Sequence, residues 1–281
     1  MRSLFQKLRA KIGLGRTLEH FGPPVLGSAV RLPNGAFQFQ IEVAKGMPYE
    51  IEATTNLKNW VSIFTGTAAG ETDFRDSNAS KFSYRFYRLN SNGRYSLNVI
   101  GYASITLSPG FSMVGNPLFG GNDRLPELFE KMPDGTSVSK FDNVLHRLKE
   151  NALKAGQWTN PRDRLGPGEG AIVLNPSLDY RILTFVGEAK LGGFAISVPA
   201  GFSIQTSSVP EPGALYPDLG FPMEDGDVIH QFDRDQQKYV LYPYVGKGWA
   251  AGPPIMSVAE SFWVAKKSPG NWLRYLPIQE D

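Results

Sequence analysis

Cysteine is absent from this chain of 281 residues. Its absence excludes disulfide bonds, thiolate metal ligands and covalently attached haem, but it leaves the cellular compartment open. Histidine is scarce as well, and the three that occur, His20, His146 and His230, lack the spacing of metal ligands. Because a zinc site normally needs three or four ligands close together, the sequence gives no support to metal-dependent catalysis.

Long apolar runs and an excess of one charge are also missing. No stretch reaches the roughly 18 apolar residues of a membrane span, so we expect no transmembrane segment. The 29 basic and 27 acidic residues give a net charge of +2, which is too small for the basic surface of a nucleic-acid-binding protein. We therefore expect no nucleic-acid partner.

Two common signatures of nucleotide and ester chemistry do not occur. The glycine-rich stretch 166–170 lacks the lysine and the following serine or threonine of a phosphate-binding loop, and its proline removes an N–H donor. A Gly-x-Ser-x-Gly nucleophile elbow is absent. We therefore expect no cofactor and no enzymatic activity.

The chain is instead rich in turn-forming and aromatic residues. It contains 30 glycines and 21 prolines, and 12% of its residues are aromatic. This combination is typical of many short strands joined by tight turns. The length of the chain allows two or three domains with cores of their own.

The most informative pattern is an internal duplication with a constant separation of 91 residues. Gly110-Phe111-Ser112 recurs as Gly201-Phe202-Ser203, and the match continues without a gap. The other matched pairs include Met132 with Met223, Asp134 with Asp225, Phe141 with Phe232, Asp142 with Asp233, Trp158 with Trp249, Glu169 with Glu260, and Ser177 with Ser268. Such a register indicates one fold unit present twice, which we call module 1 (97–188) and module 2 (189–281).

Residues 1–24 differ in composition from the rest and are predicted to form a basic arm. Five basic residues accompany a single acid, and four apolar residues fall near helical spacing, namely Leu4, Phe5, Leu8 and Ile12. Charges interrupt the apolar residues throughout, so we recognise no secretory signal peptide. The sequence leaves three alternatives open: an unstructured extension, an assembly arm that docks on a neighbouring subunit, or a membrane-surface helix.

Between residues 25 and 96 the pattern changes to alternation. Apolar and polar residues alternate over 36–43, which predicts a half-buried strand. The run 49–60 (YEIEATTNLKNW), with Phe74-Arg75-Asp76 and the segment 85–89, resembles the small fibronectin type III-like or immunoglobulin-like domain of large secreted bacterial proteins. That resemblance implies a β-sandwich that serves as a spacer or an adhesive unit.

Both modules are predicted to consist mainly of strands. They resemble a tandem module found beside such sandwiches in secreted, cell-surface bacterial proteins, and the segments that carry the resemblance are 108–113, 114–118, 132–136 and 165–170. One difference between the modules is expected at 143–157, where apolar residues sit at helical spacing, namely Val144, Leu145, Leu148, Ala152 and Leu153. We expect a helix or a long irregular loop there, whereas the same part of module 2 predicts a hairpin.

Acids placed equivalently in both modules are the first candidate functional side chains. They are Glu169 with Glu260, Asp142 with Asp233, and Asp134 with Asp225. Two carboxylates can hydrolyse a glycosidic bond, but a catalytic pair is rarely needed twice in the same form, so we expect these acids to accept backbone N–H bonds at turns. Asn122-Asp123 and Asp233-Arg234-Asp235 supply oxygen ligands, but neither matches a complete calcium-binding loop.

Trp158 and Trp249, at equivalent positions, are the second candidates. Sugars stack on exposed aromatic rings, so the two indoles are a candidate ligand platform for carbohydrate. The alternative is that each ring fills the core of its module, because its large apolar area dominates packing.

The sequence therefore predicts an all-β protein: a basic helical arm (1–24), a fibronectin type III-like β-sandwich (25–96), and modules 1 and 2 (97–188 and 189–281). We expect a non-enzymatic structural protein, outside the cell or at its surface, that self-associates into a filament or a surface layer through exposed sheet edges. The alternative function is a carbohydrate-binding or adhesive module.

Overall fold

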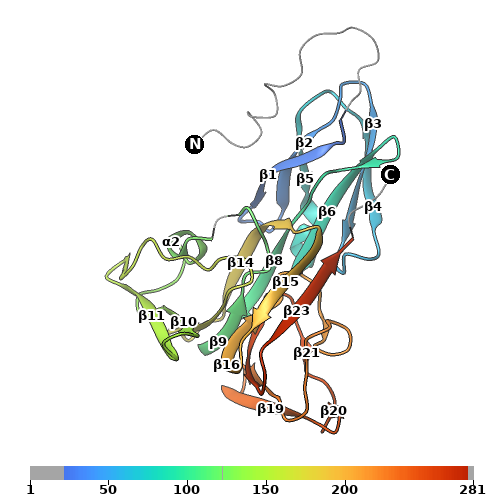
Figure 1. Cartoon of the computed structure of the whole chain (residues 1–281). Coiled ribbons are helices and arrows are strands. Elements are labelled where there is room, and N and C mark those ends of the chain that lie inside the picture. The colour runs from blue at the N-terminus through green and yellow to red at the C-terminus, as the bar shows by residue number, and fades with distance from the viewer. Residues whose placement is uncertain (1–21, 122, 278–281) are drawn as a thin grey trace.

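The computed structural model describes residues 22–121 and 123–277, and these residues are almost entirely β-structure, as predicted (Figure 1). Two short helical turns interrupt the described strands, η2 (Ser77–Lys81) and α2 (Leu125–Leu128). None of the described helices is long and apolar enough to cross a membrane. The residues of the predicted assembly arm lie outside the described part of the chain, namely Leu4, Phe5, Leu8 and Ile12.

The N-terminal part is a sandwich of two antiparallel sheets. The first sheet has the order β1–β2–β5 and consists of β1 (Val25–Arg31), β2 (Phe37–Glu42) and β5 (Thr72–Asp76). The second has the order β14–β8–β6–β3–β4, with β7 (Arg94–Tyr95) beside β6, and consists of β3 (Pro48–Thr54), β4 (Val61–Thr67), β6 (Tyr84–Ser91), β8 (Val99–Leu107) and β14 (Arg181–Ala189).

Alternation in the sequence explains how these sheets pack. In β2, Phe37, Phe39 and Ile41 are buried, whereas the residues between them are partly exposed. Phe37 stacks on Tyr87 of the opposite sheet with ring centroids 5.1 Å apart. The polar face of β2 thus turns to solvent while its aromatic face forms the core of the sandwich.

Two strands of module 1 belong to this sandwich. β8 pairs with β14 on one side and with β6 on the other, from Tyr84 opposite Ala103 to Tyr87 opposite Ile100. The sheet therefore continues across residue 96, where the sequence analysis places the end of the sandwich.

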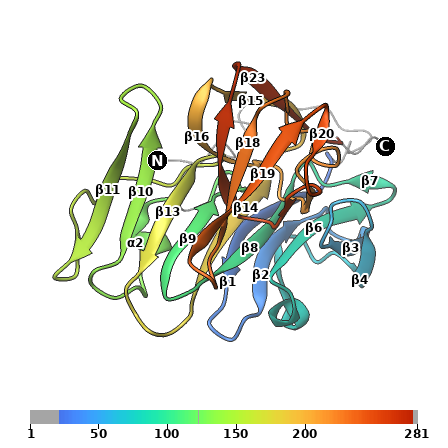
Figure 2. The same cartoon turned by 90° about the horizontal axis from the view of Figure 1, so that it is seen from below.

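Each module also has a five-stranded antiparallel sheet of its own (Figure 2). In module 1 the order is β12–β11–β10–β13–β9, with β9 (Gly110–Gly115), β10 (Ser137–Asp142), β11 (Arg147–Lys154), β12 (Gln157–Trp158) and β13 (Gly170–Asn175). In module 2 the order is β20–β19–β18–β22–β16, with β16 (Gly201–Thr206), β18 (Val228–Asp233), β19 (Lys238–Val245), β20 (Gly248–Trp249) and β22 (Ser261–Lys266). Each of these strands in module 2 begins and ends 91 residues after its counterpart, so the fold is duplicated as the sequence is.

A two-stranded ribbon completes each module. In module 1 it is β8–β14, and in module 2 it is β15 (Gly192–Val198) with β23 (Gly270–Leu276). Leu107 pairs with Arg181 at the end of the first ribbon, and the equivalent Val198 pairs with Gly270 at the end of the second. Two further short strands of module 2, β17 (Gly213–Ala214) and β21 (Ile255–Met256), pair with each other.

The two modules pack against each other through equivalent residues. A side chain on Gly115 would collide with Thr206, its counterpart, and one on Gly170 would collide with Ser261, again its counterpart. In the same way, β9 contacts β22 and β16 contacts β13. Contacts between equivalent positions indicate a local twofold relation, here within a single chain.

One apolar cluster connects all three parts of the chain. It contains Leu57 and Phe86 from the sandwich, Trp158 from module 1, and Val209 and Leu276 from module 2. A second cluster lies inside the sandwich and a third inside module 2. The described part of the chain is therefore joined by a shared core as well as by its own covalent connections.

The expectation of a helix or an irregular loop at 143–157 is wrong. β11 forms a hairpin with β10, in which Ser137 lies opposite Ala152 and Asp142 lies opposite Arg147. The apolar residues look helical in the sequence because they lie in three different settings. Val144 and Leu145 are in the turn, Leu148 is on the exposed half of β11, and Ala152 and Leu153 are at its buried end.

Candidate functional site

The duplicated glutamates hold equivalent turns. Glu169 Oε2 accepts the backbone N–H of Gly166 at 2.8 Å, and Glu260 Oε2 accepts that of Ser257 at 2.9 Å. Each carboxylate thus binds the residue three positions before it, in agreement with the turn role predicted from the sequence. Both turns lead directly into interior strands of their sheets, β13 and β22.

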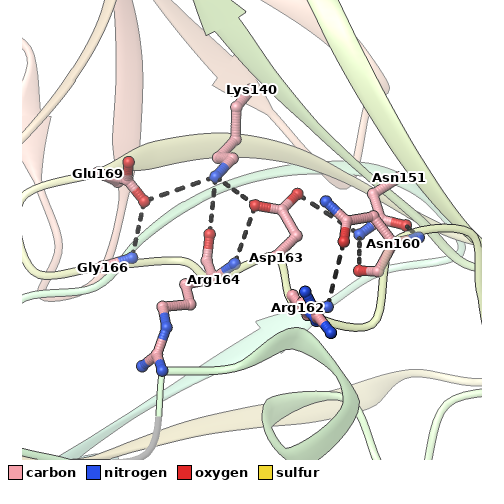
Figure 3. A network of polar contacts seen from close by, with 8 residues as sticks. All are labelled: Lys140, Asn151, Asn160, Arg162, Asp163, Arg164, Gly166 and Glu169. Atoms are coloured by element: carbon pink, nitrogen blue, oxygen red, sulfur yellow. Dashed lines mark hydrogen bonds and ion pairs between the residues drawn. The ribbon is translucent and has the colours of Figure 1, made fainter.

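In module 1 this turn belongs to a polar network (Figure 3). Lys140 Nζ donates to Asp163 Oδ1 and to Arg164 O, both at 2.8 Å, and it lies 3.7 Å from Glu169 Oε2. Asn151 Nδ2 donates to Asn160 O at 2.8 Å in the neighbouring loop. The lysine charge is therefore balanced by two carboxylates of the same module, and the network fixes the loop between β12 and β13.

Module 2 has Gln231 at the position of Lys140. Gln231 Nε2 donates to Glu260 Oε1 and to Ile255 O, both at 2.9 Å, so an amide makes the contacts that an ammonium group makes in module 1. Burial of the Glu260 carboxyl raises its pKa, and the hydrogen bonds from Ser257 and Gln231 oppose this rise. The two glutamates thus share a geometry but differ in their electrostatic surroundings.

The duplicated aspartates also bind backbone N–H groups in turns. Asp142 Oδ1 accepts from Val144 and Leu145, both at 2.9 Å, and Asp233 binds the equivalent two groups of its own hairpin. The hydrogen bond from Lys149, helped by those two backbone bonds, lowers the pKa of Asp142 to about 2.

The third pair of acids completes this pattern. Asp134 accepts the backbone N–H of Gly156, and Asp225 accepts that of Gly246. All six duplicated acids therefore hold turns. A backbone role of this kind is needed once in every copy of the fold, which accounts for their duplication.

The two duplicated tryptophans differ in burial, since Trp158 belongs to the shared apolar cluster and Trp249 packs against the edge of the cluster of module 2. Trp158 is only 7% exposed and meets Phe129 edge-on at 5.7 Å. Trp249 is partly buried, donates from Nε1 to Tyr216 O at 3.0 Å, and meets Tyr244 edge-on at 5.3 Å. The burial of Trp158 fits the core role, whereas for Trp249 the core role and the ligand platform both stay predictions.

Within residues 22–121 and 123–277, no group of three or more histidine, aspartate or glutamate side chains is placed to hold a metal ion. Asp235, one of the acids considered for calcium, accepts a hydrogen bond from the Ser108 hydroxyl at 2.9 Å. Arg234 of the same turn donates to Thr106 O at 3.0 Å. The hairpin turn of module 2 therefore contacts the β8–β9 turn of module 1.

Sequence reasoning missed an aromatic surface on module 2. It consists of Phe202, His230, Phe232, Tyr239 and Trp263, which come from four strands and contact one another with ring centroids 4.9 to 6.4 Å apart. Burial lowers the pKa of His230, so its imidazole favours the neutral form. Alternation in the sequence places each of these side chains on one face of its strand. Only the pairing of the four strands brings the faces together, and the sequence does not show that pairing.

A groove of about 1270 Å³ runs along β1 and faces β14. Beside it lie Arg31 Nη1 and Arg181 Nε, two buried donors without a hydrogen-bond partner. Because both atoms are shielded from solvent, a molecule in the groove does not reach them. The unpaired donors therefore do not mark a binding site for an anion.

The β15–β23 ribbon, which we call the open ribbon, lacks the cover of its counterpart. β8 is paired on both sides, by β14 and β6, whereas β15 pairs with β23 alone among the described strands. On its outer face, Leu273 is 70% and Tyr275 is 65% exposed. Here the strand register and not the separation of 91 residues defines the matching positions, because β23 begins 89 residues after β14. The positions in module 1 that match by register are Thr184 and Val186, and Val186 packs against the core of the sandwich.

No protein-family model, curated protein or solved structure matches this chain. The resemblance to fibronectin type III-like or immunoglobulin-like domains stays a prediction, whereas the β-sandwich itself is present in the structure. The exposed apolar surfaces of the described residues include the open ribbon and the aromatic surface.

Proposed function

We propose that this chain is a non-enzymatic structural subunit that self-assembles, outside the cell or at its surface. The open ribbon is the observation that carries the proposal. A free strand edge beside an exposed apolar face is a template for another chain. In module 1 the equivalent edge of β8 pairs with β6 of the sandwich, and β1 contacts β14, so the same fold receives a further strand at this edge within the chain.

The sequence of the open ribbon supports this role. Natural proteins protect free edges with charged residues, proline or bulges, and β15 (GGFAISV) has none of these over its paired length. The duplicated acids support the non-enzymatic part of the proposal, because their carboxylates are engaged in turns. The predicted location follows the resemblance of the modules to those of secreted, cell-surface bacterial proteins.

The test is the particle mass of the full chain over a wide concentration range, measured by light scattering and inspected by negative-stain microscopy. We expect the mass to rise with concentration and elongated particles to form. Replacing both outer-face residues, Leu273→Lys with Tyr275→Lys, is expected to keep the chain folded and to lower the mass to that of a monomer. A monomer at every concentration would contradict the proposal.

The aromatic surface favours carbohydrate binding as a second candidate. Trp263 Nε1 donates to Tyr239 Oη at 3.2 Å, and Phe202 and Tyr239 are exposed at its border. Quenching or enhancement of tryptophan fluorescence on addition of soluble glycans tests this function. Trp263→Leu should abolish the signal, whereas Trp60→Leu in the sandwich should not change it.

A further inference from the structure

We propose that β15 of one copy pairs with β4 of a second copy, which joins copies head to tail. The inference rests on the proposed self-assembly and names the two strands that make the contact.

The duplication shows what the free edge of β15 accepts. β8, its counterpart, takes an antiparallel strand of the sandwich on that edge, and Ser104 N–H donates to Ser83 O there at 2.7 Å. The residue equivalent to Ser104 is Ala195, which is exposed in the middle of β15. The edge is thus built to receive a strand from a sheet like that of the sandwich.

β4 is the free edge of that same sheet. In the order β14–β8–β6–β3–β4 it is the last strand, and it pairs with β3 alone among the described strands. β4 and β15 are both seven residues long, and neither contains a charged residue or a proline. The ladder between β4 and β3 has a one-residue bulge at Ile63, whereas the ladder of β15 is regular. Val61 is 62% and Phe64 is 41% exposed, so β4 also carries apolar surface.

The other edges of the sheets are less suited to strand addition. The strands β1, β5, β14 and β23 each contain charged residues, Arg31 in β1 and Arg274 in β23 among them. β9 and β16 are uncharged, but they contact each other between the modules. Free, uncharged edges of this length therefore occur in β4 and β15 among the described residues.

The aromatic rings next to β4 match the outer face of the open ribbon. Phe64 packs on Tyr49 and on Phe74, with ring centroids 5.8 and 5.4 Å apart. Strand addition at β15 places this cluster one strand away from Leu273 and Tyr275 of β23, across the short side chains of β15. Leu273 is 70% and Tyr275 is 65% exposed within the described chain. The contact thus buries apolar surface in addition to completing backbone hydrogen bonds.

Pairing of two different strands makes a heterologous contact, which repeats without closing unless the rotation happens to form a ring. Each copy then contributes its β4 edge to one neighbour and its β15 edge to another. A copy with one blocked edge can still use the other. This property separates the proposal from a symmetric dimer made by two β15 strands.

The first experiment blocks the two edges separately in the full chain, with Ala195→Lys in β15 and Ser62→Lys in β4. Each variant alone should be monomeric, and an equal mixture should form particles of two chains and no larger ones, because one competent contact remains. Asn143→Lys, in an exposed turn of module 1, is the matched control and should assemble like the unchanged chain. Circular dichroism and thermal unfolding confirm that each variant is folded.

The second experiment maps the contact by disulfide formation, which the absence of cysteine makes specific. Ala195→Cys and Thr65→Cys are mixed and oxidised, and covalent dimers are expected that neither variant forms by itself. Dimers of Ala195→Cys alone, or assembly that is unchanged by Ser62→Lys, would overturn the pairing with β4 but leave self-assembly standing. A monomeric unchanged chain would instead overturn the proposed function.

Discussion

Glu169 and Glu260 occupy equivalent turns in different electrostatic surroundings. Lys140 lies beside Glu169, whereas the neutral Gln231 donates to Glu260. Module 1 therefore provides a control within the same chain for the effect of burying the carboxyl of module 2.

Changing Glu260 to glutamine should alter how stability depends on pH. Because the folded pKa of Glu260 is raised, its contribution to stability is present below the unfolded value near 4.5 and is lost as pH rises through the folded pKa. Glu260→Gln has no such loss, so its stability relative to the unchanged chain should increase between pH 4 and pH 7. Urea unfolding at both pH values measures this, and Glu169→Gln is the matched control. An equal change in both variants would contradict the assignment.

A buried ion pair distinguishes module 2 from module 1. Lys266 and Asp227 are both fully buried, and Lys266 Nζ also donates to Pro222 O at 2.7 Å. Asp227 Oδ1 accepts the backbone N–H of Lys267 at 2.8 Å. The equivalent residues of module 1 are the uncharged Asn175 and Thr136, so the fold does not require the pair.

Breaking this pair should be more harmful than replacing it. Lys266→Met leaves a buried aspartate without its cation and should lower the free energy of unfolding by about 3–5 kcal/mol. The double change Lys266→Asn with Asp227→Thr installs the residues of module 1 and should recover most of that loss. Chemical denaturation of the three variants checks the order. A double variant as unstable as Lys266→Met would show that the pair itself is required.

At the scale of residues, duplication determined what could be predicted. The turn role of the glutamates follows from their recurrence in both modules. The Lys266–Asp227 pair could not be predicted in this way, because module 1 has uncharged residues at both positions. Alternation along β22 does not reveal that a lysine at its end is buried, because the covering Pro222 and Asp227 come from a distant segment.

At the scale of elements, the contact between the modules depends on a glycine, Gly115. A Cβ on Gly115 would lie 2.1 Å from Thr206 Oγ1, which is far inside van der Waals distance. Glycine is therefore needed here because of close approach between two strands and not because of its backbone angles.

Gly115→Ala should destabilise the chain by about 1–3 kcal/mol through overpacking. The double variant with Thr206→Gly removes the obstacle and should be more stable than the sum of the two single changes predicts. In Gly193→Ala, the matched control, the new Cβ would lie 3.6 Å from Tyr275 Cδ2, an ordinary contact. Additive effects in the double-mutant cycle would show that the two residues do not meet.

The hairpin of module 1 shows where element prediction fails. Leu148 and Ala152 are four residues apart and so fit a helix, but the first is exposed and the second buried on the same strand. Spacing alone cannot distinguish these cases. The equivalent hairpin of module 2 was predictable because β19 is rich in aromatic and β-branched residues.

At the scale of the whole molecule, the sequence predicts three consecutive units, and the structure shows how closely they are joined. Along the chain, the five strands of the sheet of module 1 lie between β8 and β14. Even so, β8 and β14 pair with each other and complete the sheet of the sandwich. Pairing between such distant strands leaves no periodic signal. The all-β class could thus be predicted, while the sharing of strands between sandwich and module could not.

This sharing predicts a single cooperative unfolding transition for the described units. The cluster that contains Phe86, Trp158 and Leu276 loses part of its apolar contacts if any one unit unfolds alone. Calorimetry on the Ala195→Lys variant, which removes assembly from the measurement, should give equal calorimetric and van't Hoff enthalpies. Gly115→Ala in that background should lower the melting temperature of the entire transition. A separate transition for module 2, which has an apolar cluster of its own, would show instead that the modules only touch.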